Sequence, residues 1–374
     1  MTYAASQALD AQGRFGTPCF PEDTLVLTDQ GVKPIEDIEI DDMVLTHKNR
    51  FRRVRAIDSH QADTILLSGF GHHGLECTPN HPFYALREGS SDPEWVDGES
   101  MVGSYWANVA EVPELEIPPM DFDAYPTADR EVLKGFTSVF FYFVGQYLGA
   151  GKLVTVAPEA EHSPYKMVRI RCTYSMQDQA RRFLDVFGIK YTVMNERTSC
   201  EFIISAAVLY DWLKPYFGDD SKNKTLPAFV YGIPERRRHA LLQGYIDARR
   251  AYYEPSTLAN RRHELSAAAS KKLAISMKIL AATLGIPCDV GYVNLRHHRR
   301  IAESATTNPM PFYQNIYANE DERGDTLFLD GKWYGLVEEK LPGSKHQTVY
   351  SLDVEEDDSY TADGIVVHNC NLVR

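Results

Sequence analysis

From Cys19 onward the sequence is divided into short apolar runs by turn-forming residues, and this pattern constrains the fold more than any other feature. The run from Cys19 to Thr28 is followed by Asp29-Gln30-Gly31, which is typical of a hairpin turn, and further short runs follow at 32–38 and 43–46. Strands this short and this closely spaced indicate an all-β module. We therefore expect β structure in this part of the chain.

The chain closes on an apolar run, Gly364 to Val367, that ends in three reactive side chains, His368, Asn369 and Cys370. An asparagine amide can attack its own backbone carbonyl, close a ring and cut the chain behind itself. A preceding histidine can assist the proton transfer, and a following cysteine is a nucleophile. Alone, the tripeptide is weak evidence for any function.

A matching set of residues lies far upstream. Cys19 opens the first β run, and Thr78-Pro79-Asn80-His81-Pro82 follows about 60 residues later. The two prolines stiffen the backbone on both sides of His81, so that its ring can be aimed. Taken as isolated residues, Cys19 would more often be a small buried hydrophobe and His81 an ordinary turn residue.

Together these residues resemble an intein, a segment that excises itself from a host protein. The similarity covers the run from Cys19 to Thr46, the run from Leu75 to Phe83 with its Thr-x-x-His motif, and the blocks at 349–354, 359–360 and 364–369. The resemblance implies a mainly β Hedgehog/intein (Hint) horseshoe built from two discontinuous segments, 19–128 and 322–369. The segments 1–18 and 370–374 would be the flanking exteins, its own reaction partners, and the protein a monomer.

The resemblance also implies the chemistry. Cys19 would attack the carbonyl of Pro18, with His81, its pKa near neutrality, as proton donor and Thr78 bonded to the scissile group. Cys370 would then take the acyl group, which needs mainly proximity. Asn369, assisted by His368, would cyclise and release the segment. None of these steps needs a cofactor.

Two local features bear on the rate. Pro18 fixes its own φ and restricts Thr17, so we expect it to slow or condition the first step. Ser351 stands in a block where many inteins carry an aspartate close to the first cysteine, and Asp353 would share its strand face. The sequence leaves open which of the two assists Cys19.

From about Asp129 to Asp321 the sequence changes to longer helical patterns. One predicted helix covers 132–148 and a second ends at 242–250, and each precedes β-like sequence and a helix that closes on Gly-Ile, at 188–189 and 285–286. This internal repeat resembles the LAGLIDADG homing endonucleases, and it predicts an inserted α+β domain of two repeats at 129–321, chemically silent toward splicing.

In that family two motif helices pack through glycines, here Gly145 and Gly244, and an acidic residue in each motif holds a divalent metal. The aligned positions here are Ala150 and Arg249, while Asp247 falls on another helix face. Alanine cannot ligate, and arginine puts positive charge where Mg²⁺ should sit. We expect cleavage of double-stranded DNA to be lost or severely impaired, with Mg²⁺ needed only by an active nuclease.

Basic residues gather in the second half of this insertion. Residues 235–300 contain 13 lysines and arginines against 5 acidic residues. Such clusters can contact the phosphates of double-stranded DNA, or they can be the solvated remnant of an active ancestor, and the sequence favours neither. The candidate contacts are Arg236, Arg237, Arg238, Arg261, Arg262, Lys271, Lys272, Arg299 and Arg300.

Composition narrows the classes of protein to which the chain can belong. The net charge of −13 argues against a chain that coats nucleic acid or membrane over its whole surface. No run approaches the roughly 20 apolar residues of a membrane span, and residues 1–18 lack a signal core, so we expect an intracellular protein. The six sparse cysteines should be thiols there. Cys77, His81, His72 and His73 could suggest a zinc site, but a second ligand pair at zinc-finger spacing is missing. Cys77 is more simply interpreted as a residue that packs inside the protein.

Two other functions are compatible with these patterns. One is a DNA endonuclease or DNA-binding module whose splicing apparatus is vestigial. The other is a Hedgehog-type self-cleaving domain that passes its thioester to an external nucleophile. The terminal His368-Asn369-Cys370 argues against the second, which would not need asparagine cyclisation.

Overall fold

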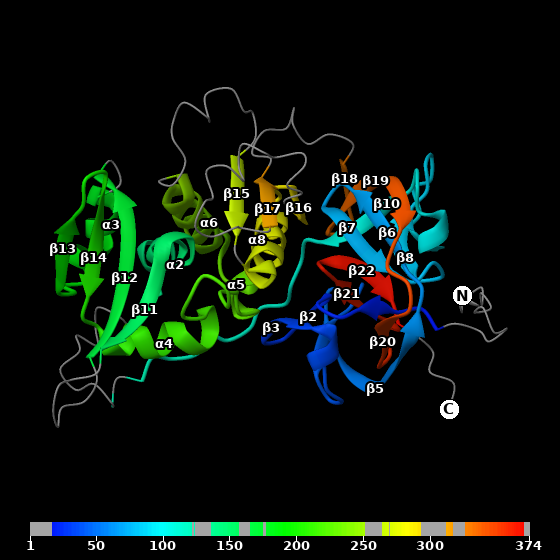
Figure 1. Ribbon diagram of the computed structural model, residues 1–374, viewed down its shortest axis with the longest axis horizontal. Coiled ribbons are helices and arrows are strands. Elements are labelled where there is room, and N and C mark those ends of the chain that lie inside the picture. The colour runs from blue at the N-terminus through cyan, green and yellow to red at the C-terminus, as the bar shows by residue number, and fades with distance from the viewer. Residues whose placement is uncertain are drawn as a thin grey trace. The chain divides into compact units, whose positions relative to one another are not determined.

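The structure, a computed structural model, describes residues 17–121, 123, 136–156, 165–174, 177–250, 264–268, 270–292, 312–316 and 326–369. The described chain is mostly β, with a curled sheet and several helices (Figure 1), so the predicted mainly β class is confirmed at this level. Within these residues, no helix combines the length and apolar character needed to cross a bilayer.

The described residues divide into two compact units. One contains those of 1–115, 227–232 and 263–374, and the other those of 116–226 and 233–262. We call them the β unit and the helical unit. The division differs from the predicted domain limits, because 263–292 packs with the β unit although it belongs to the predicted insertion.

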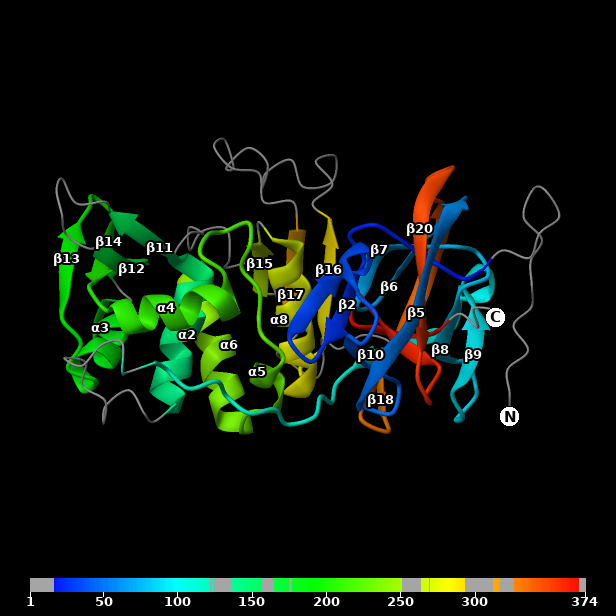
Figure 2. The ribbon, with the colours of Figure 1, turned by 90° about the horizontal axis from the view of Figure 1, so that it is seen from below.

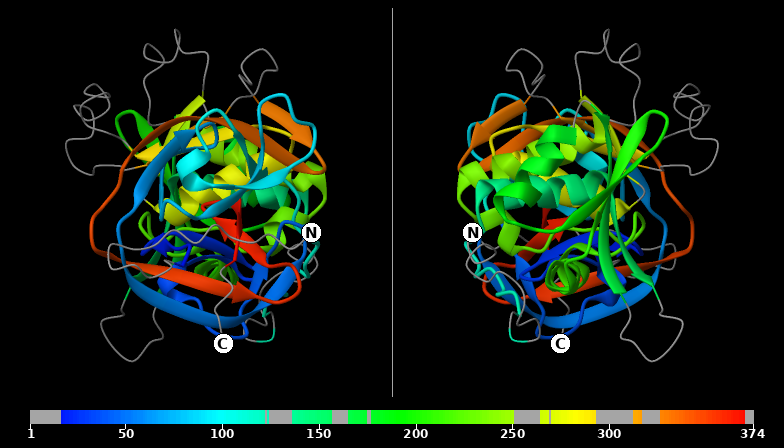
Figure 3. Two further views of the ribbon diagram at one scale, coloured as in Figure 1. Left: turned by 90° about the vertical axis from the view of Figure 1, so that its right-hand side faces the viewer. Right: turned by 90° about the vertical axis from the view of Figure 1, so that its left-hand side faces the viewer.

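A six-stranded sheet in the β unit joins the start of the chain to its end, in the order β1-β20-β5-β4-β2-β3. β20 runs along β5 as a long curved ribbon (Figure 3). The strands are β1 (Phe20–Pro21), β2 (Leu25–Thr28), β3 (Gly31–Pro34), β4 (Met43–Leu45), β5 (Phe51–Ala62) and β20 (Gln347–Val354), and η1 (Ile35–Asp37) is a 3₁₀ turn after β3.

The larger sheet of the β unit has twelve strands, with the path β15-β17-β16-β7-β6-β19-β10-β22-β8-β9; β18 pairs with β19 and β21 with β22. Its strands are β6 (Ile65–Gly69), β7 (His72–Cys77), β8 (Pro82–Leu86), β9 (Glu94–Asp97), β10 (Tyr105–Val109), β15 (Glu264–Ala268), β16 (Cys288–Tyr292), β17 (Phe312–Ile316), β18 (Thr326–Leu329), β19 (Lys332–Pro342), β21 (Ser359–Ala362) and β22 (Ile365–His368). The 3₁₀ turn η2 (Gly98–Ser100) follows β9, and the helices α5 (Phe229–Gly232) and α8 (Lys271–Thr283) belong to this unit.

Two tight hairpins illustrate how sequence sets this topology. Thr28 pairs with Gly31, so the predicted turn between β2 and β3 is confirmed. β21 and β22 are joined by Asp363 and Gly364, whose φ values are 49° and 80°. Positive φ at both central positions is the requirement of a type I′ turn, for which Asp-Gly is a preferred sequence.

One hydrophobic core ties the two ends of the chain together. It contains Phe20 and Val26 from the first strands, Trp106 from β10, and Ile365 and Val367 from the last strand, all of them at most 1% exposed. Burial of each such side chain stabilises the fold by roughly 1.5–3 kcal/mol. The core therefore holds residues 20 and 367 in one body although they lie far apart in sequence.

The helical unit packs its helices against a four-stranded sheet of order β11-β12-β14-β13. Its elements are α2 (Ser138–Ala150), β11 (Gly151–Val156), β12 (Tyr165–Thr173), α3 (Gln177–Val186), β13 (Tyr191–Asn195), β14 (Ser199–Ile204), α4 (Ala207–Phe217) and α6 (Glu235–Arg250). Thr137 begins α2 as an N-cap, its hydroxyl accepting from the Phe140 N–H.

α2 and α6 lie against each other (Figure 2). A Cβ on Gly145 would strike the carbonyl oxygen of Leu241, and one on Gly244 would strike that of Tyr142. Only glycine permits backbones to approach this closely. The prediction that these two glycines form the helix contact is therefore confirmed.

The predicted internal repeat also appears in the element order. The first copy runs α2-β11-β12-α3-β13-β14, and the described part of the second runs α6-β15-α8-β16-β17. The strands pair in the same order, β12-β14-β13 in one and β15-β17-β16 in the other. Both short helices end on the predicted glycine, Gly188 with φ 59° and Gly285 with φ 73°.

A buried carboxylate at the β21–β22 turn joins four elements of the β unit. The Asp363 carboxylate accepts from the Leu25 N–H at 2.9 Å and lies 3.1 Å from His72 Nε2 and 2.9 Å from Lys271 Nζ. Lys278 Nζ donates to the Asp363 carbonyl at 3.1 Å. Burial alone would raise the pKa of Asp363, but Lys271 and His72 hold it well below its usual range.

Asp363→Asn should destabilise the protein by about 3–5 kcal/mol, because the largely buried ammonium groups of Lys271 and Lys278 lose the carboxylate that offsets their charge. Asp41, whose side chain is 71% exposed beside Arg53, gives the matched control, and Asp41→Asn should change stability by less than about 1 kcal/mol. Because the folded pKa of Asp363 is lowered, its stabilisation is complete above pH ~5 and should fade below pH ~4. Denaturant midpoints across pH measure this, and equal effects of the two variants would contradict it.

Candidate functional site

The residue immediately before the β unit's first strand is held through both its backbone N–H and its carbonyl by one threonine. Cys19 is fully buried, its N–H donates to Thr78 Oγ1 at 2.9 Å, and its carbonyl accepts from the Thr78 N–H at 3.0 Å. The register of β1 with β20, in which Phe20 faces Tyr350, aligns the strand that follows. The Thr78 hydroxyl therefore lies beside the nitrogen of the Pro18–Cys19 bond.

His81 lies between β7 and β8 in a turn closed by its own N–H, which donates to the Thr78 carbonyl at 3.1 Å. Its ring packs against aromatic rings, with centroids 4.2 Å from Phe20, 5.8 Å from Phe83 and 6.4 Å from Tyr360. The His81 side chain is fully buried among these rings. Aromatic rings packed this closely around an imidazole exclude water, which favours its uncharged form.

The pKa of His81 is lowered well below its ordinary value. Burial is the main cause, the nearby His368 adds to it, and a backbone group of His368 acts in the opposite direction. The expected pKa near neutrality is thus wrong, because the aromatic rings that remove water from His81 could not be foreseen from the sequence. β22 pairs with β8 at Val367 and Phe83, and this pairing brings His368 near His81.

Asn369 is held by two carboxylates. Its side chain is buried, and its Nδ2 donates to Asp353 Oδ1 and to Asp358 Oδ1, both at 3.2 Å. Its backbone N–H donates to the Asp358 carbonyl at 2.8 Å. Acceptors of full negative charge draw the amide proton away from the nitrogen, which makes that nitrogen a better nucleophile.

The carbonyl that Asn369 would attack is bound by its neighbour. His368 Nδ1 donates to the Asn369 carbonyl oxygen at 2.8 Å, and the His368 ring stands edge-on to Trp95 at 4.8 Å between centroids. A donor at this position polarises the carbonyl and would stabilise the oxyanion formed upon attack. His368 and Asn369 are thereby already arranged for one reaction.

Ser351 and Asp353 take different places. If the register between β1 and β20 is continued by one residue, Cys19 falls opposite Ser351, which is fully buried. Asp353 instead contacts Asn369 and forms an ion pair with Arg55 at 2.9 Å. The geometry thus associates Asp353 with the C-terminal end of the segment.

The sequence alone does not identify two residues of the site. His60 of β5 places Nδ1 3.9 Å from Cys19 Sγ, and Asp358 lies in the loop between β20 and β21. His60 sits in a polar, irregular stretch of sequence, and its approach to Cys19 depends on the long-range pairing of β5 with β20. Asp358 stands eleven residues before Asn369, so only its place in the C-terminal block could have indicated it.

Lys224 and Arg249 bind backbone carbonyls at the C-terminal end of α2. Lys224 Nζ donates to the carbonyls of Tyr147 at 2.6 Å and Gly151 at 2.7 Å, and an Arg249 guanidinium nitrogen donates to the Gly149 carbonyl at 3.3 Å. Both side chains are buried and satisfy carbonyls at the C-terminal end of α2. Burial first, and then Arg249, lower the pKa of Lys224 to about 7.

This arrangement does not fit Mg²⁺. Ala150 offers no ligand, and Asp247 accepts instead from the Tyr142 hydroxyl and the Gln243 amide, both at 2.7 Å. Among the residues that the structure describes, no three His, Cys, Asp or Glu side chains gather as a metal site requires. No step of any reaction is therefore assigned to a metal here.

The predicted DNA contacts fall in three groups. Arg236, Arg237 and Arg238 lie in the first turn of α6, where Arg236 is exposed. Lys271 is only 16% exposed and pairs with Asp363, while Lys272 is half-buried beside it on α8. The remaining candidates are Arg261, Arg262, Arg299 and Arg300. They lie outside the described residues, and so does Cys370.

No family model matches the chain. The chain aligns with the ATP-dependent DNA helicase Hel308 of Thermococcus kodakarensis at 22% identity. The alignment covers 94% of this chain and 36% of the helicase. At the same identity, 94% of the chain aligns with 43% of an iron-sulfur cluster assembly SufBD family protein of Mycobacterium tuberculosis. The chain thus spans less than half the length of each of these relatives.

Two solved structures share part of the arrangement. The homing endonuclease I-DmoI aligns with 50% of this chain and 86% of its own, at 15% identity and a TM-score of 0.35. The gp41-1 intein aligns with 26% of this chain and 71% of its own, at 20% identity and a TM-score of 0.22. Both scores are too low to support an argument about function.

Lys224 should make stability depend on pH. Its pKa is about 7 in the folded protein and near 10.4 when unfolded, so between these values the unfolded chain binds the extra proton and stability rises with pH. The free energy of unfolding of the wild type minus that of Lys224→Met should increase by up to about 1.4 kcal/mol per pH unit from pH ~7 to ~10. Lys214, 52% exposed, is the matched control. A wild-type slope retained in Lys224→Met would contradict this.

Proposed function

We propose that residues 19–369 excise themselves by protein splicing and ligate the flanks 1–18 and 370–374. In this proposal the β unit is the core of a Hint horseshoe formed by 19–128 and 322–369, interrupted by a degenerate LAGLIDADG-like region at 129–321. The observation that carries the proposal is Asn369, with its amide on two carboxylates and its carbonyl on His368. Few functions other than cyclisation require this arrangement.

The first step would convert an amide into a thioester. The Cys19 thiol attacks the Pro18 carbonyl, the new bond joins Sγ to that carbon, and the bond from the carbon to the Cys19 nitrogen breaks. The thiol loses a proton and the leaving nitrogen gains one. Thr78 Oγ1 is 2.9 Å from that nitrogen. His81, neutral at rest because its pKa is low, would give up a proton readily after receiving one, which suits a relay.

The second and third steps would use the other end. Cys370 takes the acyl group from the Cys19 thioester, which is a nearly energy-neutral exchange between thiols. Asn369 Nδ2 then bonds to its own carbonyl carbon, the bond to the Cys370 nitrogen breaks, a carboxylate takes the Nδ2 proton, and the leaving amine gains a proton. His368 stabilises the oxyanion during this cyclisation. The thioester between the flanks finally rearranges to an amide.

The sequence relatives support a portable segment. Almost the whole chain aligns with less than half of a protein named a DNA helicase and less than half of one named an iron-sulfur assembly protein. The two names share no function, so the shared part is more simply a self-excising insertion than a domain serving both hosts.

The second candidate function is DNA binding by the inserted region. The repeated order of α2 to β14 and of α6 to β17, with glycines at the helix contact, favours descent from a DNA endonuclease. The cations at Lys224 and Arg249 argue against cleavage. In this alternative the splicing residues are vestigial and Arg236, Arg237 and Arg238 contact phosphates.

A precursor with long tags at both ends should yield ligated tags in reducing buffer. Cys19→Ala should abolish ligation while leaving release of the C-terminal tag, and Asn369→Ala should block that release, because each removes the nucleophile of one step. Gel electrophoresis of the tagged products measures both. Unprocessed precursor across pH and temperature would contradict splicing and leave the DNA-binding alternative.

The carboxylates at Asn369 can be tested separately. Asp358→Asn combined with Asp353→Asn keeps the size of both side chains but removes the proton acceptors, so C-terminal release should slow on the order of 10²-fold or more. Asp41→Asn, which changes an exposed carboxylate that pairs with Arg53, is the matched control. Release at the wild-type rate in the double variant would show that the carboxylates only occupy space.

A further inference from the structure

A histidine on β5 approaches the thiol at the N-terminal end of the segment. His60 Nδ1 lies 3.9 Å from Cys19 Sγ and 3.3 Å from Thr17 Oγ1, and these two atoms are 3.6 Å apart. The thiol, the hydroxyl and the imidazole therefore form a triangle of mutual contacts. β5 is held there by β20, in which Val349 pairs with His60.

The thiol needs a base that His81 does not provide. The thiolate rather than the thiol is the nucleophile, and Cys19 is fully buried, so bulk water has little access to its proton. The ring of His81 is fully buried and packs among Phe20, Phe83 and Tyr360. His60, by contrast, is partly exposed and can return its proton to solvent.

We propose that His60 is the general base of the first splicing step, a proposal that rests on the splicing function above. In the tautomer with its proton on Nε2, Nδ1 accepts the Cys19 thiol proton while Sγ bonds to the Pro18 carbonyl carbon. The bond between the Pro18 carbonyl carbon and the Cys19 nitrogen then breaks. That nitrogen receives a proton from the Thr78 hydroxyl, which regains one from His81 after His81 has taken up a proton, and His60 gives the thiol proton to solvent. The net change is one proton moved from sulfur to nitrogen through solvent, with no oxidant, reductant or cofactor.

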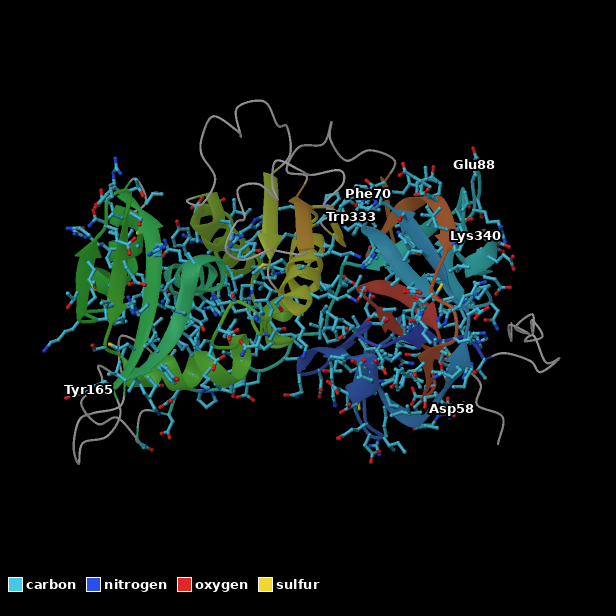
Figure 4. All side chains as sticks on the ribbon, viewed as in Figure 1. Asp58, Phe70, Glu88, Tyr165, Trp333 and Lys340 are labelled. Carbon is cyan, nitrogen blue, oxygen red and sulfur yellow. The ribbon has the colours of Figure 1, made fainter. Side chains whose placement is uncertain are left out.

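The side chains that share the strand face of His60 carry little charge. On β5, Asp58 shares the face of His60 two residues away and is exposed (Figure 4). On β20, the same face carries Gln347, Val349 and Ser351, none of which is charged. From the β1 side, the Cys19 thiol and the Thr17 hydroxyl contact the ring.

The test isolates thioester formation. A tagged precursor carrying Asn369→Ala and Cys370→Ala stops at the Cys19 thioester, and dithiothreitol then releases the N-terminal tag at a measurable rate. His60→Gln in this parent should slow release on the order of 10²-fold at pH 7. The difference should shrink toward pH 9, because hydroxide and the ionising thiol then replace the base. His346→Ala, a surface histidine whose side chain is 82% exposed, should keep the parent rate and profile.

Folding is checked in the same protein. In a precursor that retains Asn369 but carries Cys19→Ala, His60→Gln should leave C-terminal release unchanged. Equal rates and equal pH profiles for the parent and His60→Gln would overturn the role of His60 alone. A parent that dithiothreitol does not cleave at any pH would overturn splicing as well, so the two failures are distinguishable.

Discussion

The buried carboxylate of Asp363 is the interaction on which the site depends. It occupies the turn immediately before β22 and binds β2 through Leu25, β7 through His72 and α8 through Lys271. A charge this deeply buried is tolerated only when its partners are fixed, so it locks these elements in one arrangement. β22 then leads directly to His368 and Asn369, while β2 follows the strand that begins after Cys19. The contacts of Asp363 thus set the positions of both ends of the segment.

The contacts of Asp363 give the region 129–321 a structural role that the sequence did not suggest. We expected 129–321 to be silent toward the splicing residues, yet α8 supplies two lysines to the turn before the last strand. β16 also pairs with β7 in parallel, and Asp289 accepts from the Gly71 N–H. The second repeat has therefore become part of the β unit, whereas the first repeat packs with α6 in a unit of its own.

Local patterns predicted more of the structure than long-range contacts did. The hairpin at Asp29–Gly31, the glycine contact between α2 and α6, and the helix ends at Gly188 and Gly285 follow from turn chemistry and periodicity within a few residues. His60 beside Cys19, Lys224 on the end of α2, and the aromatic box around His81 depend on strand pairing and packing across more than 40 residues. The sequence shows which side chains exist, but not which of them lose water or meet, and both pKa and reactivity follow from that.

The two ends of the segment differ in how they are prepared. Cys19 is held through its backbone by Thr78, whereas Asn369 is held through its side chain by carboxylates, so each step has its own support. The intact mass of the excised segment tests the central claim most directly. Cyclisation leaves a C-terminal aminosuccinimide, so residues 19–369 should weigh one water molecule less than the same segment with a free carboxylate. A released segment of the heavier mass from the outset, without ligated flanks, would show hydrolysis and contradict splicing.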